Sequence, residues 1–139
     1  MEEGVCAMLI KQIHSELEKN GNNALRKDDL TLSQMSALIE LDKAEGKQME
    51  LKHLEEALHI AKSTTVGIVQ RLEQKEFVES LGSPYDKRIR VIHMTPLGED
   101  CCRKARENMK TEEIKLTSAL TETERDILIT LLQKVRDSF

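Results

Sequence analysis

The hydrophobic positions in the middle of the chain form two successive helical repeats. Leu51, Leu54 and Leu58 recur at i, i+3 and i+7, which predicts a short amphipathic helix. A second helical repeat runs from about 62 to 75. Its inner face is formed by Thr65, Ile68, Val69 and Leu72. His59 stands between the two repeats, and histidine is one of the residue types enriched in left-handed backbone. The pattern therefore predicts two helices that meet at a tight turn.

An alternating pattern, typical of a hairpin, follows the second helix. The runs 77–81 and 89–94 are rich in β-prone residues and flank a loop that contains glycine and proline. Side chains alternate between the two faces of a strand, so Arg88 and Arg90 are expected on one face, with Lys87 nearer the tip. Two helices at a turn, followed by a basic hairpin, predict a winged helix-turn-helix in which the hairpin is the wing.

The residues before this motif predict two further helices. The apolar stripe of the first helix consists of Val5, Leu9, Ile13 and Leu17. This helix is expected over about 2–19, because the loop-favouring residues 20–30 follow it. Thr31 and Gln34 form a capping box, which starts a second helix that Gly46 can end.

The residues after the hairpin also predict two helices. Pro96 suits the first turn of a helix of about 20 residues, and a capping box that begins at Thr121 starts another. The apolar face of this last helix consists of Ile127, Leu128, Leu131, Leu132 and Val135. The helices at 1–20 and 96–139 present more apolar surface than a small lobe over about 31–95 can bury. We therefore expect them to pack against another surface.

The composition favours a mainly α-helical protein. A chain of 139 residues is large enough for one hydrophobic core, and no linker rich in Pro, Gly or Ser divides it. The chain has two Phe, one Tyr and no Trp, whereas 33% of its residues are charged, which suits amphipathic helices better than a β-sandwich. We expect one domain over 1–139 that is mainly α with a small β wing.

The charge is unevenly distributed along the chain. The formal net charge is -4, yet residues 61–93 carry 6 Lys and Arg against 4 Asp and Glu. Residues 1–60 carry 7 against 12. Acidic flanks can orient the basic part toward phosphate by repelling a duplex elsewhere. Because the basic excess is small, binding to nucleic acid should be modest and should fall steeply with salt.

Six short motifs occur in order along nearly the whole chain. They are LTLSQ at 30–34, AKSTT at 61–65, RLE at 71–73, DKR at 86–88, MTPLG at 94–98 and LTETE at 120–124. Together they resemble the MarR family of bacterial transcriptional regulators. The resemblance implies a homodimer whose N- and C-terminal helices interlock, with recognition helices roughly 34 Å apart on a palindromic double-stranded DNA site. It also implies a repressor that is released when a small molecule enters the crevice between the dimerisation helices and the winged lobes.

Five candidates for DNA contact lie on the second helix of the motif. Lys62, Ser63 and Thr64 open this helix, where backbone N–H groups favour a phosphate or a base acceptor. In the alternative interpretation, Ser63 and Thr64 only cap the helix. Gln70 either pairs with adenine or is a solvated surface residue. Arg71 follows it as a further DNA-binding candidate.

The other candidates for DNA contact lie in the wing. By resemblance, a basic wing residue enters the minor groove, while an aspartate and an arginine hold the wing by an ion pair. Lys87 and Arg90 are the better candidates for phosphate or groove contact, and Arg88 is either inserted or paired. Asp86 is expected to be structural. The alternative is a charged hairpin that is merely solvated.

Three residues depart from the pattern of the family. Gly67 and Glu79 stand where an arginine is common, and Glu76 replaces the glycine that usually ends the recognition helix. Glu76 would have to adopt a left-handed backbone, at a cost of roughly 1 kcal/mol, or end the helix in another way. Base reading in the major groove is therefore expected to be weak, with more dependence on groove shape and on the wing. The same residues motivate an alternative function, a winged-helix dimer that acts through protein–protein contact.

The remaining reactive residues predict no catalytic, metal or cofactor site. Cys6, Cys101 and Cys102 are an odd number of thiols in a chain large enough to fold without disulfides, and packing is a better explanation for them than redox sensing. The histidines show no i, i+4 spacing, and no Cys-x-x-Cys occurs. No apolar run is long enough to span a membrane and the acidic start does not fit a signal peptide, so a cytoplasmic protein is expected.

Overall fold

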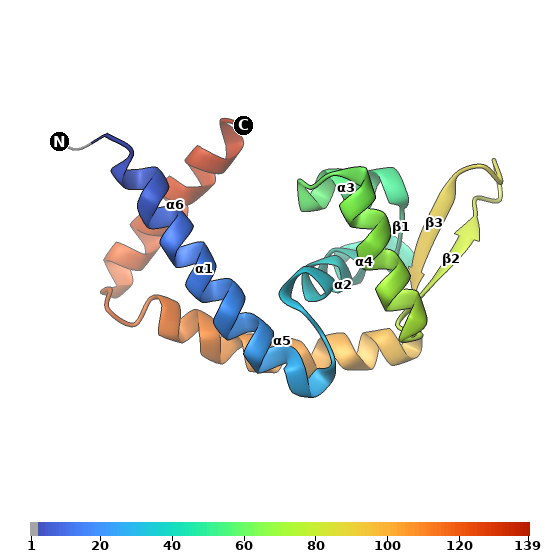
Figure 1. The fold of residues 1–139 in the computed structure, drawn as a ribbon, viewed down its shortest axis with the longest axis horizontal. Coiled ribbons are helices and arrows are strands. Elements are labelled where there is room, and N and C mark those ends of the chain that lie inside the picture. The colour runs from blue at the N-terminus through green and yellow to red at the C-terminus, as the bar shows by residue number, and fades with distance from the viewer. Residues whose placement is uncertain (1–2) are drawn as a thin grey trace.

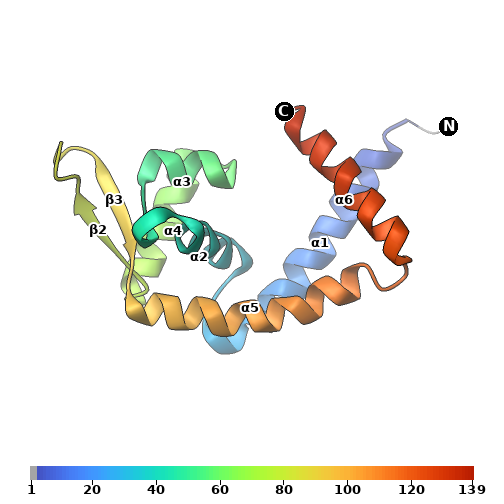
Figure 2. The ribbon, with the colours of Figure 1, turned by 180° about the vertical axis from the view of Figure 1, so that it is seen from behind.

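The computed structural model describes residues 3–139, in which a winged lobe stands beside a group of long helices (Figure 1). The helices are α1 (Val5–Leu25), α2 (Leu32–Lys43), α3 (Leu51–Leu58), α4 (Lys62–Gln74), α5 (Pro96–Leu116) and α6 (Glu122–Asp137), and the strands are β1 (Gln48–Glu50), β2 (Val78–Gly82) and β3 (Arg90–Met94). The winged lobe comprises α2, α3, α4 and the three strands. The helical platform comprises α1, α6 and the C-terminal half of α5. Seen from behind, α5 runs beneath both parts (Figure 2).

The two predicted strands of the wing are confirmed, with a third strand beside them. β3 lies in the middle of an antiparallel sheet, and Ile92 faces Met49 of β1 on one side and Ser80 of β2 on the other. The sequence analysis missed β1, because its three residues show no alternation and their hydrogen-bond partners lie far along the chain. α2 ends at Lys43, and Gly46 turns the chain toward β1 with a left-handed backbone (φ 69°).

The hydrophobic core lies between the helices of the lobe, the sheet and the first half of α5. The largest fully buried side chains are Leu25, Met35, Leu38, Leu41, Leu54, Thr65, Val69, Leu72, Ile92, Met94 and Cys102. The predicted inner face of α4 is thus confirmed, apart from Ile68, which is half-buried. The buried Thr65 hydroxyl donates to the carbonyl oxygen of Ala61 at 3.1 Å, so it leaves no unsatisfied polar group in the core.

The first helix is longer than predicted. It continues through the asparagine-rich stretch and ends at Leu25, whose side chain is buried, so the predicted end near residue 19 is wrong. The loop-favouring residues serve tertiary contacts instead: Asn22 Oδ1 accepts from the backbone N–H of Leu32 at 2.7 Å, and a β-carbon on Gly21 would lie 3.3 Å from Leu32 Cδ1. The predicted start at residue 2 lies outside the described residues.

Both predicted capping boxes are confirmed. The Thr31 hydroxyl accepts from the N–H of Gln34 at 3.2 Å, and the Thr31 N–H donates back to the Gln34 side chain at 3.3 Å. The same reciprocal pair joins Thr121 and Glu124 at the start of α6, at 2.9 and 3.1 Å. Hydrogen bonding from the backbone N–H of Thr121, followed by that from its side chain, lowers the pKa of the Glu124 carboxyl below its usual value.

The helical platform exposes apolar faces in the single chain. Ile127, Leu131, Leu132 and Val135 of α6 are each at least half exposed. α6 has no buried residue, and on α1 Leu9 and Ile13 are similarly exposed. Clustered apolar surface of this kind is typical of an interface.

Candidate nucleic-acid interface

The start of α4 is open to solvent. Its N-cap residue is Ala61, which offers no side-chain acceptor, and Lys62, Ser63 and Thr64 follow it with exposed side chains. Neither Ser63 nor Thr64 occupies the N-cap position, so the interpretation that they only cap the helix does not fit this geometry. The positive end of the helix dipole and its first N–H groups thus face solvent beside a lysine, an arrangement that favours an anion.

Left-handed residues form the turn within the helix-turn-helix motif and the end of its second helix. His59 adopts φ 55°, as predicted, and its N–H donates to the Glu56 carbonyl at 3.2 Å. Glu76 adopts φ 62°, which is the left-handed one of the two alternatives for this position. The Glu76 N–H donates to Glu73 and the Phe77 N–H donates to Leu72, which is the hydrogen-bond pattern of a Schellman motif. The chain can therefore leave α4 for the wing without a glycine.

A local ion pair shapes the loop of the wing. Asp86 Oδ1 accepts from the backbone N–H of Arg88 at 3.0 Å and from its Nε at 3.1 Å, and Oδ2 accepts from Nη2 at 3.1 Å. The Arg88 guanidinium, followed by its backbone N–H, lowers the pKa of the Asp86 carboxyl. β3 begins at Arg90, so the prediction that Arg88 and Arg90 share one strand face is wrong. Arg88 belongs to the loop, because its bonds to Asp86 close a tight turn there.

The other two wing cations differ sharply in their surroundings. The Arg90 guanidinium lies 3.1 Å from Glu73 Oε1 and donates to Ser80 Oγ at 2.9 Å. The Lys87 side chain is exposed, and its ammonium forms no hydrogen bond or ion pair with any residue of 3–139. Lys87 is thus available to an external anion, whereas Arg90 is already bonded.

A groove of about 670 Å³ separates the wing from α3 and α4. Its lining residues are Glu50, Leu51, Lys52, Glu55, Lys62, Val66, Arg88, Ile89 and Arg90. The groove brings Lys62 of α4 together with two wing cations. Four cationic side chains and two carboxylates line it, and two of the cations, Arg88 and Arg90, are paired with Asp86 and Glu73 at its edge. The sequence analysis did not name Lys52 of α3 as a candidate for DNA contact. Gln70 and Arg71 lie outside the groove, on the exposed side of α4.

Gly67 leaves a gap on the outer side of α4. A β-carbon added there would meet no described atom within 4 Å, so packing does not require a glycine at this position. Glu79 is exposed on β2 beside the wing. Both departures from the family pattern therefore lie on the surface, where they reduce the positive charge available to a duplex.

The cysteines and histidines form no second site among the described residues. Cys102 is buried, Cys101 is half-buried and Cys6 is exposed. Burial raises the pKa of both the Cys101 and the Cys102 thiols, which disfavours the reactive thiolate. Within residues 3–139, no group of three or more His, Cys, Asp or Glu side chains is placed to hold a metal ion. In the same part of the chain, none of the helices has the length and apolar character that crossing a bilayer requires.

Comparison with known proteins shows which family the chain resembles. Residues 30–89, from just before α2 to the wing, match the MarR family. Over 134 residues the chain is 25% identical to the transcriptional repressor MprA of Escherichia coli, covering 96% of this chain and 76% of MprA. A crystal structure of a mutant MarR from Escherichia coli complexed with operator DNA is similar at a TM-score of 0.85 and 26% identity, covering 93% of this chain and 91% of that one. The chain is therefore similar to the MarR family over nearly its whole length, and residues 30–89 match the family itself.

The MarR-family fold extends over the whole described chain. A MarR family transcriptional regulator from Streptomyces coelicolor, in complex with DNA, matches at a TM-score of 0.89 and 19% identity, covering 98% of this chain and 86% of that one. At this identity the likeness concerns the fold alone. The predicted fold class, mainly α with a small β wing, is confirmed, as is the resemblance that the six motifs indicated.

Proposed function

We propose that this MarR-like protein is a transcriptional regulator that binds double-stranded DNA as a homodimer and represses the genes beside its site. The observation that carries the proposal is the groove in which the open start of α4 and the basic wing bring cationic side chains together. The proposed contacts are Lys62, Ser63, Thr64, Gln70 and Arg71 of α4 and Lys87 and Arg88 of the wing. Asp86 holds the wing loop. The similarity to a repressor and to a MarR complexed with operator DNA supports this assignment.

The helical platform supplies the proposed dimer interface. The exposed apolar faces of α1 and α6 would be covered by the same helices of a second copy, with residues 1–20 and 96–139 as dimerisation segments and 31–95 as the lobe of a single domain. A two-fold axis presents two α4 helices to neighbouring major grooves, roughly 34 Å apart, so the expected site is palindromic. Such a regulator acts by binding and not by catalysis, in the cytoplasm where bacterial DNA lies.

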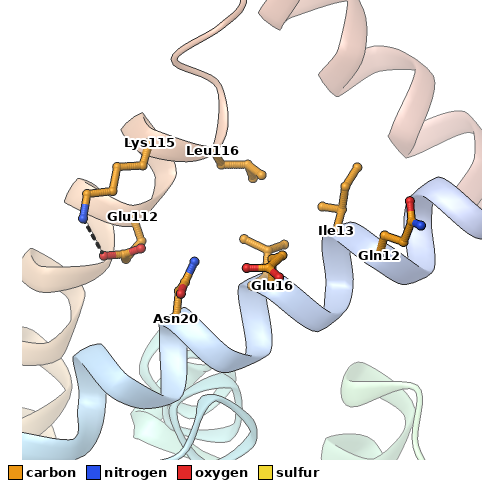
Figure 3. A pocket seen from close by; sticks show the side chains of 8 residues that line it. Gln12, Ile13, Glu16, Asn20, Glu112, Lys115 and Leu116 are labelled. Atoms are coloured by element: carbon orange, nitrogen blue, oxygen red, sulfur yellow. Dashed lines mark hydrogen bonds and ion pairs between the residues drawn. The ribbon is translucent and has the colours of Figure 1, made fainter.

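A crevice between α1 and the end of α5 is the proposed site of a small-molecule effector. Its volume is about 340 Å³, and the side chains of Ile13 and Leu116 lie across from one another in it (Figure 3). A smaller hollow of about 190 Å³ continues from it to Leu32 of the lobe. A ligand there would reduce DNA binding if it favours a separation of the lobes that does not fit the operator.

The proposal is tested by gel shift of the full-length protein on duplex DNA of mixed sequence, followed by footprinting across a bacterial genome. We expect binding at low ionic strength that weakens steeply with salt, and protected sites with two-fold symmetry. A protein that shifts no duplex at low ionic strength would contradict the proposal. That result would favour the alternative of a winged-helix dimer that binds another protein, to which Glu76 and Glu79 point.

Lys87→Ala should weaken binding on every sequence. Because this ammonium has no protein partner among the described residues, its loss should remove one phosphate contact and lower the slope of log K against log salt by about 1. The matched control is Lys110→Ala on α5, which removes an exposed lysine far from the groove and should leave the slope unchanged. A normal slope for Lys87→Ala would remove Lys87 from the interface.

Gln70→Ala should change sequence preference and leave the salt slope unchanged. A side-chain amide can pair with both adenine N6 and N7, and losing such a pair costs about 1–3 kcal/mol of discrimination. The measurement is selection of bound sequences from a random duplex pool with the wild type and the variant. Identical preferred sequences would mean that Gln70 is only a solvated surface residue.

A further inference from the structure

One guanidinium connects three elements of the winged lobe. Arg90, at the start of β3, bonds through Nη2 to Glu73 Oε1 at 3.1 Å and to Ser80 Oγ at 2.9 Å. The Ser80 hydroxyl donates to the same oxygen of Glu73. Glu73 lies in the last turn of α4 and Ser80 in the middle of β2. These three side chains, the Arg90–Glu73–Ser80 latch, therefore tie both strands of the wing to α4.

The latch differs from the contacts of the other wing cations. Arg88 bonds to Asp86, two residues away, so its ion pair shapes the loop without reaching α4. Lys87 has no such partner within residues 3–139. The latch, by contrast, joins residues 17 positions apart in the sequence.

The latch lies at the junction of α4 and the wing, where it restrains the movement of the wing relative to α4. The chain passes from α4 to β2 through the single left-handed residue Glu76, which sets the direction of the backbone at that point. The latch spans this turn, from Glu73 before it to Ser80 and Arg90 after it, so it fixes how far the wing opens from α4. Its side chains are partly withdrawn from water, with Arg90 40% and Glu73 34% exposed, which strengthens a hydrogen-bonded ion pair relative to a fully exposed one.

The ion pair with Glu73 also determines whether Arg90 can contact a phosphate of the duplex. Its charge is matched by a carboxylate at 3.1 Å, and contact with a phosphate would have to displace Glu73 and leave that carboxylate facing the DNA. On the basis of the DNA binding proposed above, we propose that the latch fixes the angle between the wing and α4. Arg90 is then a positioning residue that acts on DNA binding through Glu73 and Ser80 and not by contact with phosphate.

The sign of the effect of Glu73→Gln separates positioning from direct contact. Removing a negative charge near the phosphates and freeing Arg90 should tighten binding and steepen the salt dependence if Arg90 is a phosphate contact. If the latch positions the wing, Glu73→Gln should weaken binding about fivefold, on the scale of coupling within one hydrogen-bond network. Ser80→Ala, which changes no charge, should weaken it about threefold with an unchanged salt slope.

Exchanging the charges of Arg90 and Glu73 tests whether the ion pair itself restores DNA affinity. Arg90→Glu should bind poorly, and adding Glu73→Arg restores an ion pair of opposite orientation, so the double variant should regain most of the lost affinity. A phosphate contact at position 90 would not be regained in this way. The matched control is Lys87→Glu combined with Glu73→Arg, which introduces the same charges but joins no ion pair of the latch, so it should not regain affinity.

Hydrogen exchange of the DNA-free protein tests the latch by a route that needs no duplex. Backbone amides of β2 and β3 should exchange several-fold faster in Glu73→Gln and Ser80→Ala than in the wild type or in Lys87→Ala, because a loosened wing opens more often. Unchanged exchange in both variants would overturn the latch. Tighter, more salt-sensitive binding of Glu73→Gln would overturn the positioning role of Arg90, whereas a wild type that binds no DNA would overturn the proposed function and leave the exchange result to decide the latch.

Discussion

Leu131→Glu should convert the protein from a dimer to a monomer. Leu131 lies on the exposed apolar face of α6, where it is 52% exposed in the single chain. In a two-fold interface the substitution occurs twice, and each copy buries an unpaired carboxylate in place of a leucine that contributes about 2 kcal/mol. A monomer engages one half-site, so affinity for a palindrome should fall by about 100-fold or more.

Sedimentation and gel shift measure this effect together. Gln133→Glu is the matched control, because it adds the same charge to the same helix about 200° around its axis from Leu131. Deleting 121–139, the segment that contains α6, should likewise give a monomeric or poorly soluble chain. A Leu131→Glu protein that sediments as a stable dimer would refute the role of α6.

Gly98→Ala should destabilise the fold by about 3 kcal/mol, at the upper end of what overpacking usually costs. A β-carbon at this position in the first turn of α5 would collide with the carbonyl oxygen of Phe77 and lie 3.0 Å from Met94 Cγ. The Phe77 carbonyl cannot simply move away, because it accepts from the N–H of Thr95 at 3.0 Å. The clash therefore pushes α5 away from the base of the wing.

Urea unfolding at one fixed protein concentration measures this loss, since the stability of a dimer depends on concentration. Gly67→Ala is the matched control, because it makes the same chemical change in a helix with no described atom within 4 Å of the new β-carbon. Alanine is favoured over glycine inside a helix, so the control should be stabilised by about 0.5–1 kcal/mol. Equal stability of Gly98→Ala and the wild type would mean that α5 does not pack as closely as described.

The elements that the sequence predicted well are those set by neighbouring residues. The capping boxes at Thr31 and Thr121 depend on residues three positions apart, and the left-handed turns at His59 and Glu76 depend on where one helical repeat stops. The two strands of the wing follow from a local alternation of side chains. These features can be predicted from the sequence because the residues that determine them lie close together along the chain.

The features that the sequence analysis missed depend on distant partners. β1 exists because β3 supplies its hydrogen bonds, and α1 passes through a stretch of loop-favouring residues because Asn22 and Gly21 contact Leu32. The candidate DNA interface likewise combines features that the sequence predicts with features that depend on distant partners. Its cations could be named from the two motifs, but the partner of Arg90 and the place of Lys52 in the groove required the fold.

α5 is one unbroken helix of 21 residues, roughly 31 Å long at 1.5 Å per residue. Its first half carries Cys102 and Ala105 into the core of the lobe, while Leu116 at its far end borders α1. A rigid helix of this length would transmit a movement at Leu116 to the lobe at its other end. A small molecule that displaced Leu116 would then shift the wing as well, and its binding would oppose that of a duplex which requires the original position of the wing.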